Sequence, residues 1–207
     1  MTTRFLDQEK VRKALDSAQS FGATYAEVRV VALTESTVAM RDGALEKAIP
    51  GQELGMTLRV LADGAWGVHS TTDLASLGDQ IESTTRLAKA VAKRRSSEEG
   101  PKALAEVPII QDETHWRSKL DVRHTELDEK IRLMNEMYSG AMGHEDIVSV
   151  RTGWSDEHIH TELMTTEGMD RVWSFQRSLI HGMVTASRDG GVVSYRTRQG
   201  GQGGLEV

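Results

Sequence analysis

The chain has 207 residues with a formal net charge of −6; 27 % of the residues are charged and 38 % are hydrophobic. This length suits one large domain or two small ones. The chain contains no cysteine, which excludes disulfides, a thiol nucleophile and cysteine-based zinc sites. No apolar run approaches the roughly 18 residues of a membrane span, and the first residues lack the apolar stretch of a signal peptide. The acidic balance argues against general nucleic-acid binding. We therefore expect a soluble, cytoplasmic α+β protein that binds neither nucleic acid nor membranes.

The first predicted helix covers residues 7–21. Asp7 suits the N-cap, and Gly22 suits the first position past the end. Apolar side chains recur along it at helical spacing, namely Val11, Ala14, Leu15, Ala18 and Phe21.

Four strands are expected next, and alternation orients one of them. In the third, Met56, Leu58 and Val60 alternate with Thr57 and Arg59, so we expect the three apolar side chains to face the core. The expected strand ranges are 25–33, 36–42, 54–61 and 65–70.

A second helical pattern follows, with apolar residues at Leu74, Leu77, Ile81, Leu87, Ala88 and Val91. Its C-terminal end is basic, with Lys89, Lys93, Arg94 and Arg95. Such a cluster is able to contact a phosphate or an acidic partner, but we favour a solvated face that complements the helix dipole.

Residues 96–123 read as a linker, because Ser96–Pro101 lacks periodicity and Pro108 interrupts the pattern. Within or beside it, His115, Trp116, Arg117 and His124 are too scattered to define a site, and we interpret them as surface or packing residues.

A third helix, expected over residues 125–142, precedes a second group of strands, expected over 146–153, 157–166, 171–187 and 192–198. Acid–glycine turns occur in the same order in both groups: Asp42-Gly43 and Asp63-Gly64 in the first, Glu167-Gly168 and Asp189-Gly190 in the second. The pattern predicts antiparallel β-meanders with packed helices, and two related α-β units as one hypothesis. Two unrelated stretches of hairpins are the alternative. The expected organisation is residues 1–95, a linker 96–123, residues 124–199, and a glycine-rich hinge 200–207 toward an absent C-terminal domain.

His158, His160 and Glu162 share one face of a predicted strand. Two imidazoles and a carboxylate are able to bind zinc, but same-face residues of a straight strand lie about 7 Å apart, which strains a common site. We favour the polar face of an edge or half-exposed strand. The chain has no H-E-x-x-H pair, P-loop or G-x-S-x-G elbow, so no catalytic, cofactor-binding or metal-binding residue is predicted.

Residues 54–74 resemble the TldD/PmbA family, also known as modulators of DNA gyrase. The similarity lies in a glycine-led strand, a hairpin, and Gly67-Val68-His69-Ser70-Thr71-Thr72-Asp73-Leu74 opening a helix. Thr72 stands where the family often has asparagine, and the Trp66 hairpin is nearer the TldD branch. Tyr25–Arg29, the Arg41–Glu46 turn and the ending Arg198–Glu206 are also similar, so the resemblance covers essentially the whole chain.

The resemblance implies part of a metallopeptidase that cleaves small or unfolded peptides. The family's metal motif, H-E-x-x-x-H with a later cysteine, has no match here, so zinc is expected only in an absent C-terminal domain and this chain alone is expected to be inactive. Family members work as homodimers or heterodimers, which implies that this region shapes the substrate cavity and the dimer interface. A free-standing interaction module of the same fold is the alternative, and a metalloenzyme built on His158, His160 and Glu162 is a third hypothesis.

Overall fold

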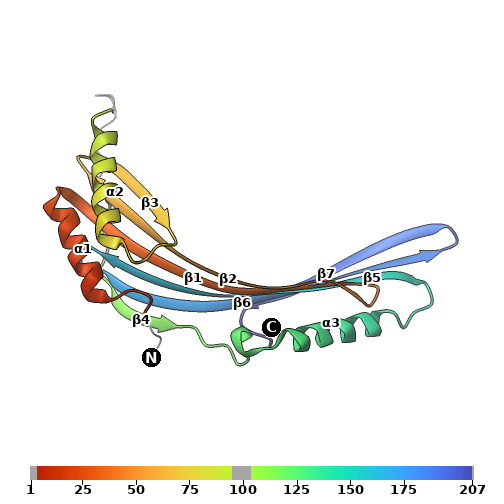
Figure 1. The fold of residues 1–207 in the computed structure, drawn as a ribbon. Coiled ribbons are helices and arrows are strands. Elements are labelled where there is room, and N and C mark those ends of the chain that lie inside the picture. The colour runs from red at the N-terminus through yellow and green to blue at the C-terminus, as the bar shows by residue number, and fades with distance from the viewer. Residues whose placement is uncertain (1–3, 95–103, 207) are drawn as a thin grey trace. The chain divides into compact units, whose positions relative to one another are not determined.

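The computed structural model describes residues 4–94 and 104–206. Seven strands form one sheet in the order β3-β2-β1-β5-β6-β4, with β7 paired to β6, and helices pack on it (Figure 1). The α+β class with antiparallel hairpins is confirmed. In chain order the elements are α1 (Gln8–Ser20), β1 (Ala23–Arg41), β2 (Ala44–Ala62), β3 (Ala65–Thr71), α2 (Leu77–Ala92), β4 (Gln111–His115), a 3-10 helix η1 (Val122–His124), α3 (Leu127–Ala141), β5 (Ile147–Thr165), β6 (Asp170–Arg188) and β7 (Gly191–Gln202).

The described residues divide into two compact units. Unit 1 takes its residues from Met1–Ala32, Leu54–Thr114 and His160–Trp173. Unit 2 takes its residues from Leu33–Glu53, His115–Ile159 and Ser174–Val207. Each of the long strands β1, β2, β5 and β6 therefore contributes one part of its length to each unit.

Three hairpins turn on an aspartate–glycine pair, as the sequence predicted. Asp42, Asp63 and Asp189 have φ of 50°, 51° and 51°, and the glycine that follows each is also at positive φ. Two consecutive residues in the left-handed region make a type I′ turn, whose twist matches that of the flanking strands. Gly168 also has positive φ, at 96°, but Glu167 does not, so the turn between β5 and β6 is of another type.

Helix α1 begins and ends where the sequence indicates. The Asp7 carboxylate accepts hydrogen bonds from the backbone N–H of Glu9 at 2.7 Å and of Lys10 at 3.2 Å, which is an N-cap. Gly22 follows the C-terminal residues with φ of 91°.

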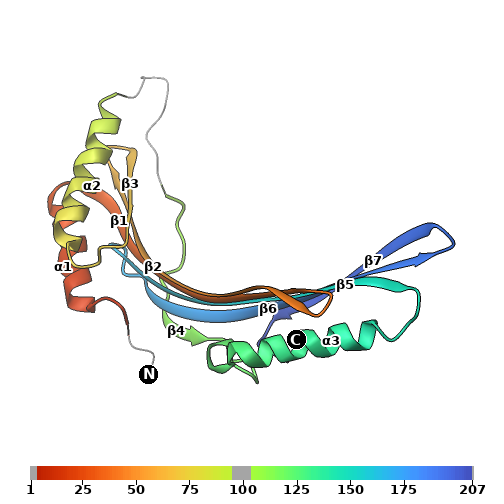
Figure 2. The same cartoon turned by 45° about the vertical axis from the view of Figure 1, so that its right-hand side comes forward.

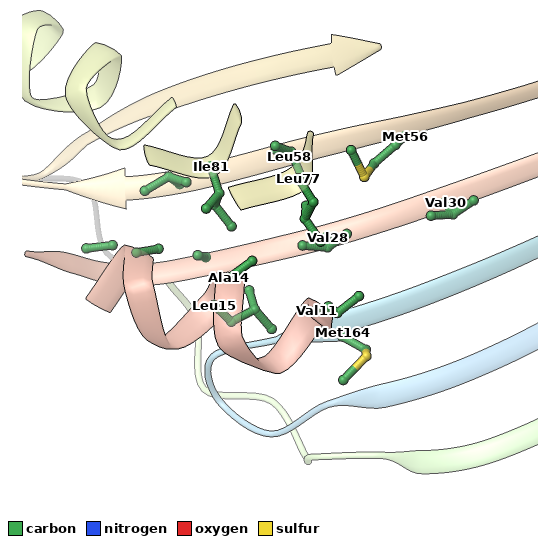
Figure 3. Packing of buried hydrophobic residues seen from close by; sticks show 14 residues of the cluster. Val11, Ala14, Leu15, Val28, Val30, Met56, Leu58, Leu77, Ile81 and Met164 are labelled. Carbon is green, nitrogen blue, oxygen red and sulfur yellow. The ribbon is translucent and has the colours of Figure 1, made fainter. Parts of the chain in front are cut away.

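The core of unit 1 lies between the sheet and helices α1 and α2, which cover the same face of strands β1–β3 (Figures 1 and 2). Met56, Leu58 and Val60 are fully buried in it, which confirms their predicted orientation. Val11 and Leu15 of α1, Val28 and Val30 of β1, and Leu77 and Ile81 of α2 fill the rest (Figure 3). The backbone of α2 approaches β3 closely, because a Cβ on Gly67 would lie 2.3 Å from the carbonyl oxygen of Thr84.

Unit 2 has its own core beneath α3. Val38 and Met40 of β1 and Trp154 of β5 pack against Met134 of α3, and all four are buried. Strand side chains alternate between faces, so the neighbours of Val38 and Trp154 point away from α3. We call that side the α3-distal face of unit 2.

Several interruptions that the sequence predicted between strands are absent. The sequence predicted separate strands at 25–33 and 36–42 and none over 44–53, whereas β1 and β2 are continuous through these residues. Pro50 resembles a breaker, but β3 pairs with β2 over Met56–Ala62, so Pro50 lies where β2 is an edge strand, a position that tolerates proline. Strand β4 lies in the expected linker, and Gly200 and Gly201 continue β7 by pairing with Leu179 and Ser178. The domain boundaries themselves remain predictions. The order helix–strand–strand–strand does occur twice, as α1-β1-β2-β3 and α3-β5-β6-β7.

Candidate functional site

His158, His160 and Glu162 lie on β5 and are buried, with exposed fractions of 9 %, 4 % and 5 %. The expectation of an edge or half-exposed strand is wrong, because β5 lies between β1 and β6 in the sheet. Alternation alone does not reveal that both faces of a strand are covered.

In unit 1, Glu162 and His160 hold the segment before α1. The Oε1 atom of Glu162 lies 3.1 Å from Nε2 of His160 and accepts a hydrogen bond from the backbone N–H of Phe5 at 2.8 Å. The Phe5 ring meets the His160 ring edge-on, with centroids 5.5 Å apart. Across the described ranges 4–94 and 104–206, no group of three or more histidine, aspartate or glutamate side chains is arranged to hold a metal. These contacts give His160 and Glu162 an anchoring role.

A cavity of about 790 Å³ in unit 2 opens on the α3-distal face. We call it the polar cleft. Strands β1, β5, β6 and β7 all contribute side chains to it. Those that decide its chemistry are Glu35, Glu157, Phe175, Arg177, Leu179 and Arg198.

Opposite charges lie side by side on the floor of the polar cleft. Glu157 of β5 and Arg177 of β6 form an ion pair across neighbouring strands. The Arg177 guanidinium also lies 6.0 Å from the centroid of the Phe175 ring. A cleft with two carboxylates, two guanidinium groups and an aromatic side chain suits a ligand that has both polar and apolar parts, such as a peptide.

A buried polar cluster supports the polar cleft from the α3 side. The Nζ atom of Lys130 lies 2.6 Å from Oδ2 of Asp156 and 2.7 Å from Oγ of Ser36. The hydroxyl of Ser36 donates to Asp156 at 2.9 Å, and the indole N–H of Trp154 donates to the same carboxylate. Ser36 and Asp156 are flanked along their strands by residues of the cleft, so the cluster holds the cleft floor in place.

The pair Ser36–Lys130 does not serve as a nucleophile and its base. The Nζ atom of Lys130 donates to the Ser36 hydroxyl, and this hydroxyl donates to Asp156, so the lysine is not placed to accept the hydroxyl proton. Both side chains are also buried beneath α3. The cluster is therefore structural.

Unit 1 carries a second polar cluster that sequence reasoning missed. The Tyr25 hydroxyl donates to Glu27 at 2.6 Å, and Arg59 donates to the other oxygen of Glu27 at 3.2 Å. The Arg59 guanidinium lies 4.5 Å from the Trp66 ring centroid. Burial, and then the hydrogen bond to Glu27, raises the pKa of Tyr25 above its ordinary range. Tyr25 and Glu27 are two residues apart on β1, and that spacing is the only sequence signal for the cluster.

The basic end of α2 forms no evident site. Lys89 extends over Gly22, where its Nζ lies 2.8 Å from the position that a Cβ would occupy. This places an ammonium beside the C-terminal end of α1, a favourable location for a positive charge. Lys93 and Arg94 are exposed, and Arg95 lies outside the described residues.

The four residues interpreted as surface or packing residues behave in that way. His115 contacts the Ser174 hydroxyl at 2.7 Å, and the backbone N–H of Trp116 donates to the carbonyl of Ser174 at 2.8 Å. The side chains of Trp116, Arg117 and His124 are exposed.

Two family models match the chain. One is described as PmbA/TldA metallopeptidase domain 1 and matches residues 26–93, and the other is described as PmbA/TldA metallopeptidase central domain and matches residues 120–207. Two curated proteins are similar over most of the chain. A metalloprotease of Methanothermobacter thermautotrophicus is 25 % identical over 183 residues, which are 88 % of this chain and 38 % of the relative. A metalloprotease of Methanocaldococcus jannaschii is 25 % identical over 200 residues, which are 96 % of this chain and 42 % of the relative. The chain thus spans about two fifths of the length of these relatives.

Solved structures share the fold. A proposed modulator of DNA gyrase from Thermotoga maritima has a TM-score of 0.75 at 16 % identity, covering 97 % of this chain and 45 % of that protein. A similarly described protein from Bacteroides thetaiotaomicron has a TM-score of 0.73 at 17 % identity, covering 95 % and 46 %. TldE from Thermococcus kodakarensis has a TM-score of 0.66 at 14 % identity, covering 91 % and 42 %. None of the described helices is long and apolar enough to cross a bilayer.

Proposed function

The chain belongs to the PmbA/TldD metallopeptidase family, and from this we propose that it binds and positions peptide substrates without cleaving them itself. On this proposal the metal ion, expected to be zinc, is held by parts of the relatives that this chain does not span. The bound peptides are small or unfolded, and proteolysis occurs at that separate centre.

The family match and the lengths of the relatives support this separation of peptide binding from cleavage. The second matching model is named a central domain, and the curated metalloproteases are more than twice as long as the matched region. The described residues also lack a cluster suited to a metal. Binding and shaping of the substrate cavity is the role left for these two domains.

The polar cleft of unit 2 is the proposed peptide-binding site, and its lining is the main support for the proposal. The Glu157 carboxylate is able to accept hydrogen bonds from peptide N–H groups, and the Arg177 guanidinium is able to donate to peptide carbonyl groups. Phe175 and Leu179 offer apolar contact. The cleft lies across extended strands, where an extended peptide finds both backbone and side-chain partners.

A binding assay with a matched control tests this proposal. The probe is a labelled, unstructured peptide of about 12 residues without net charge, followed by fluorescence anisotropy; this length matches the 12 residues of β7. We expect Phe175→Ala to weaken binding about tenfold, because it removes apolar contact in the cleft. Phe21→Ala, which changes an exposed phenylalanine at the end of α1, serves as the control and leaves affinity unchanged. If wild type and Phe175→Ala bind the peptide with equal affinity, the proposed binding site is wrong.

A free-standing interaction module of the same fold is the second candidate, since the chain matches only the first and central domains of the family. A module of this kind binds a folded partner and shows no affinity for unstructured peptides. We further propose that the protein assembles as a homodimer or as a heterodimer with a family member, and that it acts in the cytoplasm.

A further inference from the structure

A second cleft in unit 2 is lined by arginine and histidine side chains. It has a volume of about 620 Å³ and adjoins the polar cleft, since Leu179 and Arg198 border both. We call it the arginine cleft. Its lining includes Arg151 of β5, Leu179, His181 and Met183 of β6, and Arg196 and Arg198 of β7.

Strand register brings the charges together. In the β6–β7 hairpin, Met183 pairs with Arg196 and His181 pairs with Arg198. Residues two apart on a strand share a face and lie about 7 Å from one another. Gly182 points toward α3, since a Cβ there would lie 3.8 Å from Met137, so its neighbours His181 and Met183 point to the α3-distal face.

Gly153 of β5 gives His181 its place in the arginine cleft. A Cβ on Gly153 would lie 2.2 Å from Cε1 and 2.3 Å from Nε2 of His181. The imidazole therefore lies directly over the glycine backbone. A larger residue at position 153 would displace it.

The guanidinium groups of the arginine cleft form no ion pair among the described residues, although Arg151 interacts electrostatically with Asp42 outside the cleft. Over the described ranges, no salt bridge joins Arg151, Arg196 or Arg198 to an acid, and no acidic residue lines the cleft. The Nε–H of Arg196 donates a weak hydrogen bond to the sulfur of Met183 at 3.3 Å. Three guanidinium groups without an ion-pair partner among the described residues are concentrated here in a chain whose net charge is −6. This local field attracts anionic ligands.

The same hairpin offers a free strand edge. Among the strands that the structure describes, β7 pairs only with β6, and its 12 residues are exposed along their whole length. In Figures 1 and 2 the tip of this hairpin extends away from α3. An exposed strand edge is a template for an added strand, whose alternate side chains then face the neighbouring pockets.

We propose that an extended, acidic polypeptide segment adds along the outer edge of β7 and places its carboxylates in the arginine cleft. This inference rests on the proposed peptide-binding function and names the preferred class of peptide. Arginine pairs with carboxylate through two parallel hydrogen bonds, which favours side chains of glutamate and aspartate. Single-stranded nucleic acid fits less well, because no phenylalanine, tyrosine or tryptophan lines the arginine cleft to stack a base.

The test compares two blocked, labelled peptides of about 12 residues, one alternating Glu and Thr and the other alternating Gln and Thr. We expect the acidic peptide to bind the wild-type chain more tightly, with an affinity that falls as salt rises. The variants Arg196→Gln and Arg198→Gln each weaken acidic-peptide binding about tenfold, because each removes one charge-assisted contact. Both side chains are exposed, so the fold is retained, and circular dichroism verifies this.

Matched controls separate the inference from the proposed function. Arg86→Gln on α2 removes an equally exposed charge and leaves binding unchanged. The inference about the arginine cleft is overturned if the two peptides bind equally well, or if the Arg196 and Arg198 variants keep the wild-type affinity. Neither result contradicts peptide binding at the polar cleft. Tighter binding of a thymidine 12-mer than of the acidic peptide also overturns it in favour of nucleic acid. If millimolar inorganic phosphate displaces the labelled acidic peptide, the cleft is a simple anion site and no strand is added to β7. This result likewise overturns the proposal.

Discussion

The ammonium group of Lys130 lies 2.6 Å from the carboxylate of Asp156, and each side chain is only 3 % exposed. The pair joins α3 to β5 beneath the polar cleft. Ser36 and Trp154 donate hydrogen bonds to the same carboxylate oxygen, Oδ2. Breaking this pair leaves a buried charge without compensation.

Replacing Lys130 with methionine should therefore destabilise the protein by about 3–5 kcal/mol, as expected for removal of one partner of a buried ion pair. Urea unfolding measures this loss. The double variant Lys130→Met/Asp156→Asn retains an acceptor for Trp154 but has no buried charge, so it should recover part of the stability. If the double variant loses as much stability as the two single variants together, the two side chains are not coupled and the prediction is wrong.

The 3-10 helix η1 should make unfolding depend on pH through Asp121. The hydrogen bond from the Arg123 side chain is the main cause that lowers the pKa of Asp121 from 3.8 to about 2. A carboxylate whose pKa is lower in the folded state stabilises that state above its unfolded pKa, and this contribution is lost as pH falls through the folded pKa. The stability difference between wild type and Asp121→Asn should hence be constant above about pH 5 and shrink between 3.8 and about 2. Urea unfolding across this range gives the difference, and a difference that does not vary with pH contradicts the assignment.

Contact between α2 and β3 should make position 67 intolerant of any side chain. A Cβ on Gly67 would meet the backbone of Thr84 and Ala88, which is unable to move without shifting the helix. We expect Gly67→Ala to cost about 1–3 kcal/mol, the usual range for overpacking. Gly78→Ala, in α2 itself, meets no atom within 4 Å and should change stability by less than about 0.5 kcal/mol. Similar unfolding midpoints for the two variants would rule out the close approach.

Exposed apolar residues on β7 should cause self-association. Val193 and Tyr195 have exposed fractions of 68 % and 73 %. They share one face of the hairpin, and exposed apolar patches tend to mark contact surfaces. Light scattering at micromolar concentration should show a dimer, most simply a two-fold one, and Val193→Lys should shift it toward monomer. A 22.9 kDa monomer at every concentration would contradict this expectation.

Features that depend on neighbouring residues were predictable from the sequence. The N-cap at Asp7 and the three Asp–Gly hairpins follow from local backbone preferences, which tertiary contacts leave unchanged. Trp66 and Trp173 lie in β3 and β6, within the expected strands 65–70 and 171–187. The buried face of Met56, Leu58 and Val60 follows from simple alternation.

Features that depend on residues far apart in the chain were not predictable in this way. Lys130, Asp156 and Ser36 look like surface residues in sequence, and only the packing of α3 on β1 and β5 brings them together. The continuity of β1 through Thr34 and Glu35 likewise depends on pairing with other strands. Both clefts are assembled from β5, β6 and β7, and no local motif signals them.

The most direct test of the central claim follows binding and cleavage of one unstructured peptide by the purified 207-residue chain, with zinc and then with a chelator. We expect the peptide to bind and to remain intact in both conditions, with Phe175→Ala weakening the binding. Cleavage that the chelator abolishes would contradict the claim, as would a zinc ion held by His158, His160 and Glu162 at about 2.0–2.2 Å.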